Sequence, residues 1–229
     1  MAHVPGATFQ MGSETGDPDE LPVHPARVAA FDMDMTEVTV AQYAACVQAG
    51  ACAGASREVA WPGVTEADQL LYSTECNGNL PERQDHAVNC LNWSMADAYC
   101  RWEGKRLPTE EEWEYAACGG DCNQGTKTQG HAGQLVVRGA SVRMLFTSRV
   151  AQSWPGPFGL YDMAGNVWEW TATSYCPYDH PGCGDPRRVI RGGSWSMGNS
   201  LFVRLTDRSP ADASTRNTSL GFRCARSSP

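Results

Sequence analysis

The sequence predicts an α+β fold that is rich in loops, with a small twisted antiparallel sheet and about three helices. Three segments start with a helix-capping residue and continue with apolar residues at helical spacing. Short strand-like stretches lie mainly near the two ends of the chain. The 23 glycines and 14 prolines are distributed throughout, which predicts many turns. Because helices and strands do not alternate regularly, the pattern favours α+β over a βαβ arrangement.

The individual elements follow from local patterns. Helices are expected from Thr39 to about Ala49, from Ser94 to Gly104, and from Thr109 through Ala117. Strands are expected over Gly6–Gly12, Arg27–Met35, Val189–Arg191, Leu201–Leu205 and Leu220–Arg226. The first and third helices carry a capping box, in which Thr39 pairs with Gln42 and Thr109 with Glu112. Residues 53–89 and 118–157 are expected to be irregular.

Charge and hydropathy exclude two classes of function. The formal net charge is -8, and acidic residues are spread along the chain. A nucleic-acid partner requires a clustered basic face, so none is expected. A membrane-spanning helix needs about 18 consecutive apolar residues, and the sequence contains no such stretch. We therefore expect neither nucleic-acid binding nor a membrane span.

Ten cysteines are the most informative part of the composition. Reduced cytosolic proteins rarely contain so many, whereas exported proteins use them for disulfides. Zinc is the alternative, but the spacing of Cys118 and Cys122 is the only knuckle-like pair in the sequence. The pattern favours disulfides and a secreted, periplasmic or cell-surface location. No signal peptide opens the sequence, so a leader or an upstream region is expected outside it.

Two segments have residues suited to binding. In Asp162–Trp170 the carboxylates of Asp162 and Glu169 bracket a turn that contains glycine. Such a turn exposes carbonyls while the carboxylates converge, which is how calcium obtains oxygen ligands. The alternative is a tight turn in which Glu169 pairs with an arginine. In the second segment, Arg191–Trp195, Ser194 has no histidine nearby in the sequence, so nothing indicates a Ser–His–Asp triad.

Six segments together carry a family resemblance. They are Pro5–Ser13, Glu37–Tyr43, Asn92–Ala116, Gly159–Thr171, Arg191–Trp195 and Gly221–Cys224. These long motifs, such as GLYDMAGNVWEWT and RGGSW, resemble the formylglycine-generating enzyme (sulfatase-modifying factor) family over nearly the whole chain. The resemblance implies a single domain over residues 1–229, with a fold related to the C-type lectin fold. It also implies bound calcium.

The resemblance assigns specific residues to the calcium site. The family's calcium loop falls on Asp162 and Glu169 by side chain, and on Gly165 and Val167 by carbonyl oxygen. A second family site precedes this loop, but residues 134–153 lack its Asn and Asp ligands. One calcium ion is therefore expected, in the turn that starts at Asp162.

The resemblance also implies one disulfide, between Cys100 and Cys224. The remaining pairs are expected from proximity in the sequence, and they are Cys46–Cys52, Cys76–Cys90, Cys118–Cys122 and Cys176–Cys183.

The positions of the family's catalytic cysteines hold other residues. In active members two cysteines follow the serine of Gly-Gly-Ser. They bind copper and activate oxygen to oxidise a sulfatase cysteine. The corresponding positions here are Met197 and Phe202. A lone thioether cannot replace two thiolates, and phenylalanine offers no ligand, so neither copper nor formylglycine generation is expected.

The expected function is that of a calcium-stabilised, non-catalytic module that binds a protein, peptide or glycan. Its groove would be lined by Asn166, Trp168, Ser194, Trp195, Met197, Asn199, Leu201, Phe202 and Arg208. Aromatic, amide and arginine groups suit such ligands. Ser196–Phe202 also matches the segment that varies in diversity-generating retroelement proteins of this fold.

Three alternatives stay open. The first is a family enzyme with altered oxidative chemistry, for which Asp207 or Glu169 would be the acid or base. The second is a pseudoenzyme that regulates a partner. The third is formylglycine generation itself, if the alignment at Met197 and Phe202 is wrong.

Overall fold

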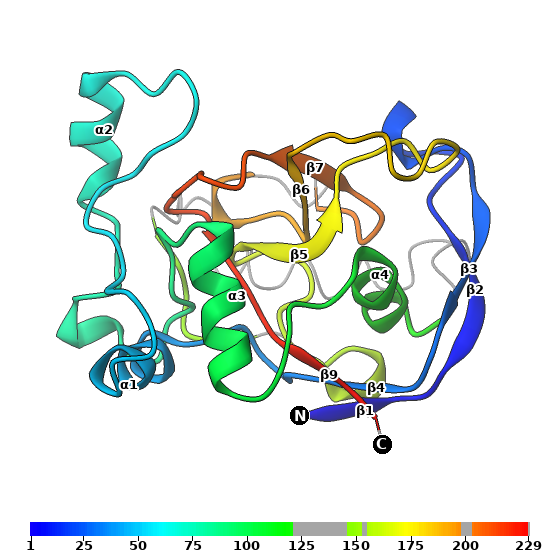
Figure 1. The fold of residues 1–229 in the computed structure, drawn as a ribbon, viewed down its shortest axis with the longest axis horizontal. Helices are drawn as coiled ribbons and strands as arrows, with labels where there is room; N and C mark the ends of the chain where they lie inside the picture. The colour runs from blue at the N-terminus through cyan, green and yellow to red at the C-terminus, as the bar shows by residue number, and fades with distance from the viewer. Residues whose placement is uncertain (121–145, 153–154, 198–202, 229) are drawn as a thin grey trace.

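Four α-helices and nine strands lie in the part of the chain that the computed structural model describes, residues 1–120, 146–152, 155–197 and 203–228. The helices are α1 (Val40–Gln48), α2 (Glu66–Ser73), α3 (Trp93–Trp102) and α4 (Glu110–Cys118). The strands are β1 (Ala2–Val4), β2 (Ala7–Met11), β3 (His24–Val28), β4 (Phe31–Met33), β5 (Trp168–Ser174), β6 (Arg188–Arg191), β7 (Arg208–Ala211), β8 (Leu220–Gly221) and β9 (Ala225–Ser227). Single 3-10 turns are η1 (Pro18–Glu20), η2 (Pro81–Arg83), η3 (Pro157–Gly159) and η4 (Trp195–Met197). Long connections join these short elements, as expected for a loop-rich α+β fold (Figure 1).

The strands form three sheets that bring distant parts of the chain together. The four-stranded sheet has the order β7-β6-β5-β8, and the others are β1-β4-β9 and the hairpin β2-β3. In the described ranges every pairing is antiparallel except that of β5 with β8, which is parallel. Because β1 and β9 both pair with β4, the two ends of the chain lie side by side (Figure 1).

The described residues form three hydrophobic clusters, of which two are large. In the first, α1 and α3 pack against the four-stranded sheet around the fully buried Trp170 and Phe222. In the second, α4 packs against β1–β4 around Trp113. Burying one large apolar side chain such as Phe222 contributes about 1.5–3 kcal/mol. α4 also contacts β5 and β6 of the four-stranded sheet, so it connects the second cluster to the first.

The capping boxes of α1 and α4 are confirmed. The Thr39 hydroxyl accepts a hydrogen bond from Gln42 N at 3.2 Å, and the Gln42 side chain accepts one from Thr39 N at 2.8 Å. Thr109 and Glu112 form the same pair of bonds at 3.2 and 2.9 Å. Each box satisfies two backbone donors that the first turn of a helix leaves free.

α2 and the start of α3 differ from the sequence prediction. α2 lies within residues 53–89, which we expected to be irregular, and Thr65 caps it by accepting from Asp68 N at 3.1 Å. None of its residues is buried, so it lacks the inward apolar stripe that marks the other helices. α3 is capped by Asn92 rather than Ser94, because the Asn92 carboxamide accepts the backbone bond across the first turn.

Most predicted strands lie at the expected positions, but the observed strands are shorter than predicted. Arg27–Met35 is divided between β3 and β4, and Leu220–Arg226 is divided between β8 and β9. Residues 203–205 are not a strand, which corrects part of the Leu201–Leu205 prediction, and its first two residues lie outside the described ranges. The strand that pairs with β6 is β7 instead, a few residues later.

Four disulfides join described cysteines as predicted. They are Cys46–Cys52, Cys76–Cys90, Cys100–Cys224 and Cys176–Cys183. The predicted partner of Cys118, Cys122, lies outside the described residues. Cys100–Cys224 joins α3 to the segment just before β9, so it ties the first cluster to the terminal sheet.

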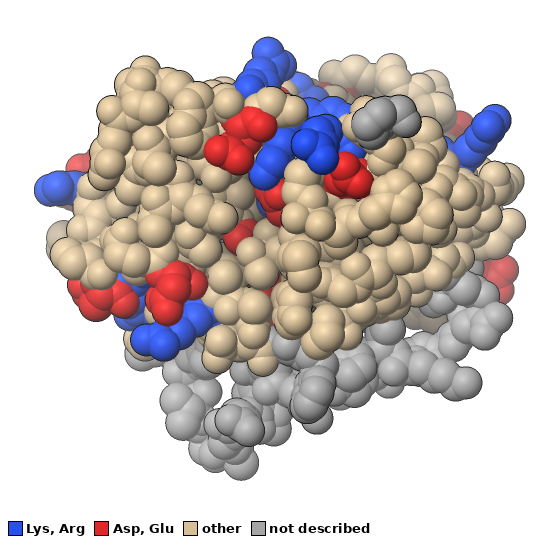
Figure 2. Space-filling model, turned by 90° about the horizontal axis from the view of Figure 1, so that it is seen from below, with Lys and Arg blue, Asp and Glu red and all other residues tan. Residues whose placement is uncertain are grey.

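The surface of the described residues carries mixed charge. On the face drawn in Figure 2, basic and acidic side chains lie next to one another in small groups. Uncharged surface separates these groups. Within the described ranges, no helix has both the length and the apolar character that a membrane span requires.

Candidate binding site

The turn that leads into β5 has an unusual backbone. Asp162, Gly165 and Asn166 are in the left-handed region, with φ of 55°, 94° and 57°. Residues other than glycine rarely adopt this region, so side-chain bonds are needed to hold Asp162 and Asn166 there. One such bond is made by Asp162, whose Oδ2 accepts from Ala151 N at 2.5 Å.

Asn166 supplies the other bonds that fix this turn. Its side-chain NH2 donates to Glu37 Oε1 at 3.0 Å, and its Oδ1 accepts from Ser148 N at 2.8 Å. Its carbonyl oxygen accepts from Trp195 N at 2.9 Å. Asn166 is 4% exposed, so its amide joins three segments inside the protein and is not presented to solvent.

Glu169, at the end of the turn, is fully buried and bound to Arg223. Glu169 Oε1 lies 2.7 Å from Arg223 Nη2, and Glu169 Oε2 lies 2.8 Å from Arg223 Nε. The Trp113 indole also donates to Glu169 Oε2 at 2.8 Å. The arginine-paired turn, which the sequence left open beside calcium, is therefore present.

Three buried carboxylates, those of Glu37, Asp162 and Glu169, lie near one another around this turn. Burial raises the pKa of the Glu37 carboxyl well above its usual range, and the nearby charges of Asp162 and Glu169 add to this effect while Arg223 opposes it. Glu37 Oε2 is buried and has no hydrogen-bond partner among the described residues. Arg223 is a guanidinium that lies near all three of these carboxylates.

The residues of the turn fit the calcium ion that the family resemblance implies. The fit rests on the hard oxygen groups gathered at this turn and on the buried Glu37 Oε2, which has no hydrogen-bond partner among the described residues. Asp162, the carbonyls of Gly165 and Val167, and Glu169 would hold the ion. Glu169 would then be shared between the cation and Arg223. Bound calcium would supply positive charge close to these buried carboxylates.

The Gly-Gly-Ser segment makes a second turn against the first. Gly192 and Gly193 have φ of 94° and 67°, and a side chain at Gly192 would collide with Trp113 and with the Met163 carbonyl. Ser194 is 1% exposed, and its Oγ lies 2.8 Å from that of Ser196. The structure therefore places Ser194 in a serine pair rather than on the surface.

The remaining predicted groove residues fall in several places. Trp195 is half-buried, and its indole donates to the Thr218 carbonyl at 3.3 Å. Met197 is half-buried, and its sulfur lies close to Gly193. The positions of Asn199, Leu201 and Phe202 lie outside the described residues.

Arg208 is 4% exposed and is held by Glu110. Its Nε and Nη2 atoms each lie 2.8 Å from a Glu110 oxygen, and Nη1 donates to the carbonyls of Asp19 and Cys176. It borders a hollow of about 660 Å³ beside the first turn of α4 and β3. None of the groove residues that the structure describes apart from Arg208 lines this hollow, so the structure separates Arg208 from Asn166, Trp168, Ser194, Trp195 and Met197.

Trp168, the first residue of β5, lines a different cleft of about 400 Å³. Trp61 lies on the same cleft, together with polar groups from the β7–β8 connection. The lining also includes Arg187, Asp212, Thr215, Asn217 and Ser219. Aromatic surfaces beside hydroxyl, amide and carboxyl groups are suited to a polar ligand with apolar faces.

Sequence reasoning missed two residues of this region. Trp61 lies in the stretch that we expected to be irregular, and no spacing rule places it opposite Trp168. Glu37 was quoted only as part of a family motif, although a buried carboxylate with a free oxygen is a strong sign of a charged site.

Comparison with known proteins identifies the family. The model of the sulfatase-modifying factor enzyme 1-like domain matches residues 1–228. The chain is 30% identical to the formylglycine-generating enzyme of Mycobacterium tuberculosis, over 98% of this chain and 96% of that one. It is 29% identical to inactive C-alpha-formylglycine-generating enzyme 2 of Mus musculus, over 99% and 85%. PvdO from Pseudomonas aeruginosa has the same fold, with a TM-score of 0.74 and 26% identity over 99% of this chain and 93% of that one.

The protein is thus a formylglycine-generating-enzyme-like domain with the C-type-lectin-like fold of this group. The chain belongs to the sulfatase-modifying factor family.

Proposed function

We propose that this protein is a non-catalytic member of its family that binds a protein, peptide or glycan outside the cytoplasm. The observation that carries the proposal is the identity of Met197 and Phe202 at the positions where active members have their copper-binding cysteines. Every cysteine in the described residues is in a disulfide, so none of them offers a free thiolate. Stable disulfides also favour an oxidising compartment. The mouse relative described as inactive shows that the family includes members without this activity.

The cleft between Trp61 and Trp168 is the surface that best supports ligand binding. Its lining includes residues of β5, β6, β7 and β8, which form one hydrogen-bonded sheet, so the cleft is preformed rather than assembled by the ligand. The indoles supply flat apolar contacts, and Asp212 and Asn217 supply polar ones. We propose this cleft in place of a groove that includes Arg208, because Arg208 is committed to Glu110.

Calcium is the second part of the proposal. The ion would be held in the turn from Asp162 to Glu169 and would stabilise the backbone that carries Trp168 into the cleft. Its role is structural, because Asp162 and Glu169 are buried and do not reach the ligand surface.

Purified oxidised protein is expected to show neither tight copper(I) binding nor oxygen-dependent turnover of a Cys-x-Pro-x-Arg peptide. The reason is that a thioether and a phenyl ring cannot replace two thiolates. Copper(I) is titrated against a competing chelator, and peptide oxidation is followed by mass spectrometry in the same sample. Copper binding together with turnover would show that the cysteines of the active site align elsewhere, and the proposal would be wrong.

Substituting Trp168→Ala is expected to weaken ligand binding at least about tenfold, because a central aromatic contact typically contributes 2 kcal/mol or more. Trp61→Ala is expected to act in the same direction. Ligands are first found with a glycan array and a peptide library, and affinities are then measured by calorimetry. Trp102→Ala is the matched control, since Trp102 is an exposed tryptophan on α3 that does not line the cleft. Equal affinities in all four proteins would show that the ligand binds elsewhere.

A further inference from the structure

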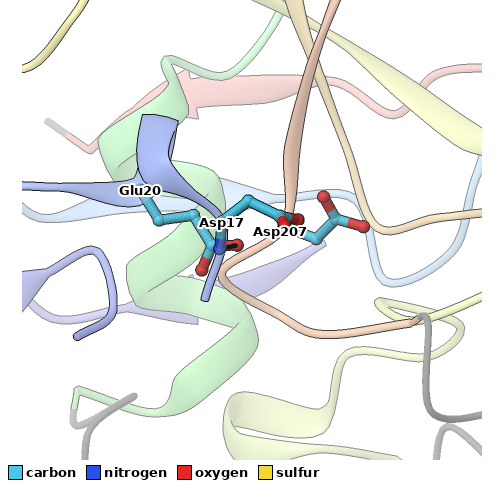
Figure 3. Close-up of side chains that lie close together, drawn as sticks. All are labelled: Asp17, Glu20 and Asp207. Carbon is cyan, nitrogen blue, oxygen red and sulfur yellow. Dashed lines mark hydrogen bonds between the residues drawn. The ribbon is translucent and has the colours of Figure 1, made fainter. Parts of the chain in front are cut away.

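Three carboxylates meet at a place that none of the family motifs covers. Asp17 and Glu20 belong to the loop between β2 and β3, which contains η1, and Asp207 directly precedes β7. One oxygen from each of the three lies within 4.8 Å of the others. Figure 3 shows the three side chains lying close together, two from the η1 loop and one from the segment before β7. Carboxylates do not approach one another in this way unless positive charge is present or one of them is protonated.

Positive charge from the protein is insufficient at this cluster. Arg204 Nη2 lies 2.7 Å from an oxygen of Asp17 and also contacts Glu20 Oε1. It is the one basic side chain in ion-pair contact with the cluster among the described residues, so one cation faces three carboxylates. In agreement, burial raises the pKa of the Asp207 carboxyl to about 6, with Arg204 opposing this rise and Glu20 and Asp17 adding to it.

Glu20 provides an independent sign that this cluster can bind a cation. Glu20 is 0% exposed. Its Oε1 accepts hydrogen bonds from Asp17 N at 2.9 Å and from Arg204. Its second oxygen, Oε2, is buried and has no partner among the described residues. A fully buried carboxylate oxygen without a donor is costly unless a cation or a proton satisfies it.

Gly16 shows how tightly this carboxylate is enclosed. A Cβ atom at Gly16 would lie 2.0 Å from Glu20 Oε2 and 2.5 Å from Oε1. The absence of a side chain at this position thus leaves the space that the Glu20 carboxylate occupies. The loop holds Glu20 in place beside Asp17 and Asp207.

We propose that Asp17, Glu20 and Asp207 form a calcium site that joins the β2–β3 loop to the segment before β7. Hard oxygen ligands on two separate segments suit calcium, which accepts irregular coordination and completes its shell with water. Asp17 is 62% exposed at its side chain, so the site opens to solvent on one side and the ion can enter. The site lies on different segments from the turn of Asp162, and the inference does not depend on ligand binding in the Trp61–Trp168 cleft.

The site would fix the described residues that directly precede β7. Asp207 lies directly before β7, which pairs with β6, so an ion at Asp207 holds the end of that segment against the N-terminal loop. Calcium would therefore add a second anchor to the one that Arg204 already makes with Asp17 and Glu20.

The test is calorimetric titration of calcium chloride into metal-free, full-length protein. The wild type is expected to show a binding event that Asp17→Asn and Asp207→Asn weaken at least about tenfold, since each removes a charged ligand. Gly16→Ala is expected to weaken it as well by displacing Glu20. Asp179→Asn is the charge-matched control, because Asp179 is exposed and outside the cluster, and it should bind as the wild type does. Asp162→Asn should leave this event in place.

Thermal denaturation gives a second measurement on the same variants. Calcium should raise the Tm of the wild type more than that of Asp17→Asn, because a ligand that binds the folded state stabilises it. Asp17 is exposed, so its variant is expected to fold. The proposal is wrong if the wild type binds no calcium, or if Asp17→Asn and Asp207→Asn bind it as the wild type does. Loss of binding only in Asp162→Asn would assign the ion to the other turn.

Discussion

Replacing Arg223 by methionine is expected to lower the free energy of unfolding by about 3–5 kcal/mol, the usual cost of removing one partner from a buried ion pair. Arg223 is fully buried and makes the only side-chain ion pair of Glu169 among the described contacts. Its Nη2 also donates to the Tyr161 carbonyl at 2.9 Å. Without the guanidinium, the buried Glu169 carboxylate loses its ion-pair partner while it lies close to Glu37, which already lacks a partner for one oxygen among the described residues.

Guanidinium denaturation, followed by tryptophan fluorescence, measures this loss. Arg101→Met is the matched control, because Arg101 forms an exposed pair with Asp97 on α3, and such pairs contribute little. Its free energy of unfolding should equal that of the wild type within error. The double variant Arg223→Met/Glu169→Leu should recover part of the loss, since it removes the unpaired charge as well. If Arg223→Met alone is as stable as the wild type, Glu169 is neutralised in another way.

Adding calcium to the Arg223→Met variant tests whether Glu169 binds a calcium ion in addition to Arg223. An ion in the turn would replace the missing positive charge, so calcium should stabilise this variant more than the wild type. Equal effects of calcium in both proteins would argue that Glu169 is not a ligand.

The helix caps were predictable because their signals are local. Thr39 and Gln42 are three residues apart, as are Thr109 and Glu112, so the sequence alone contains both partners of each box. α2 was missed for the converse reason. It has a capping Thr65, but its apolar side chains do not face the core, and Leu70 is 78% exposed. Periodicity detects burial, and this helix has none.

The contacts of the candidate site were harder to predict, because their partners are far apart in the sequence. Glu169 and Arg223 are 54 residues apart, and the sequence left the choice between calcium and an arginine open. Arg208 was expected in the groove, where an arginine suits a peptide or glycan ligand. The register of β6 with β7 instead directs it toward Glu110 on α4. Such assignments depend on strand pairing and helix packing, which no short motif specifies.

The disulfides include pairs that are close in the sequence and one pair that is distant, and these differ in how they could be predicted. Three of the pairs present in the structure are neighbours in the sequence, so proximity was enough to predict them. Cys100–Cys224 has a separation of 124 residues, and it was expected only because the family has it. The same separation makes this bond the most important of the four for stability.

Substituting Cys100→Ala and Cys224→Ala together is expected to lower the free energy of unfolding by about 5 kcal/mol, because the loss of a cross-link across so long a loop frees many unfolded conformations. The matched control is Cys46→Ala with Cys52→Ala. These cysteines are also buried, but they are only 6 residues apart, so the same model gives a loss of about 2 kcal/mol. Both double variants remove the same atoms, so cavity formation contributes similarly to each. The difference between their free energies of unfolding therefore reports the effect of loop length.

Both double variants are measured by guanidinium denaturation under oxidising conditions, with the midpoint and slope fitted separately. A larger slope is expected for the Cys100–Cys224 variant, since its unfolded chain exposes more surface. Equal losses in the two variants would mean that this bond acts through local packing around Phe222 and not through the unfolded state.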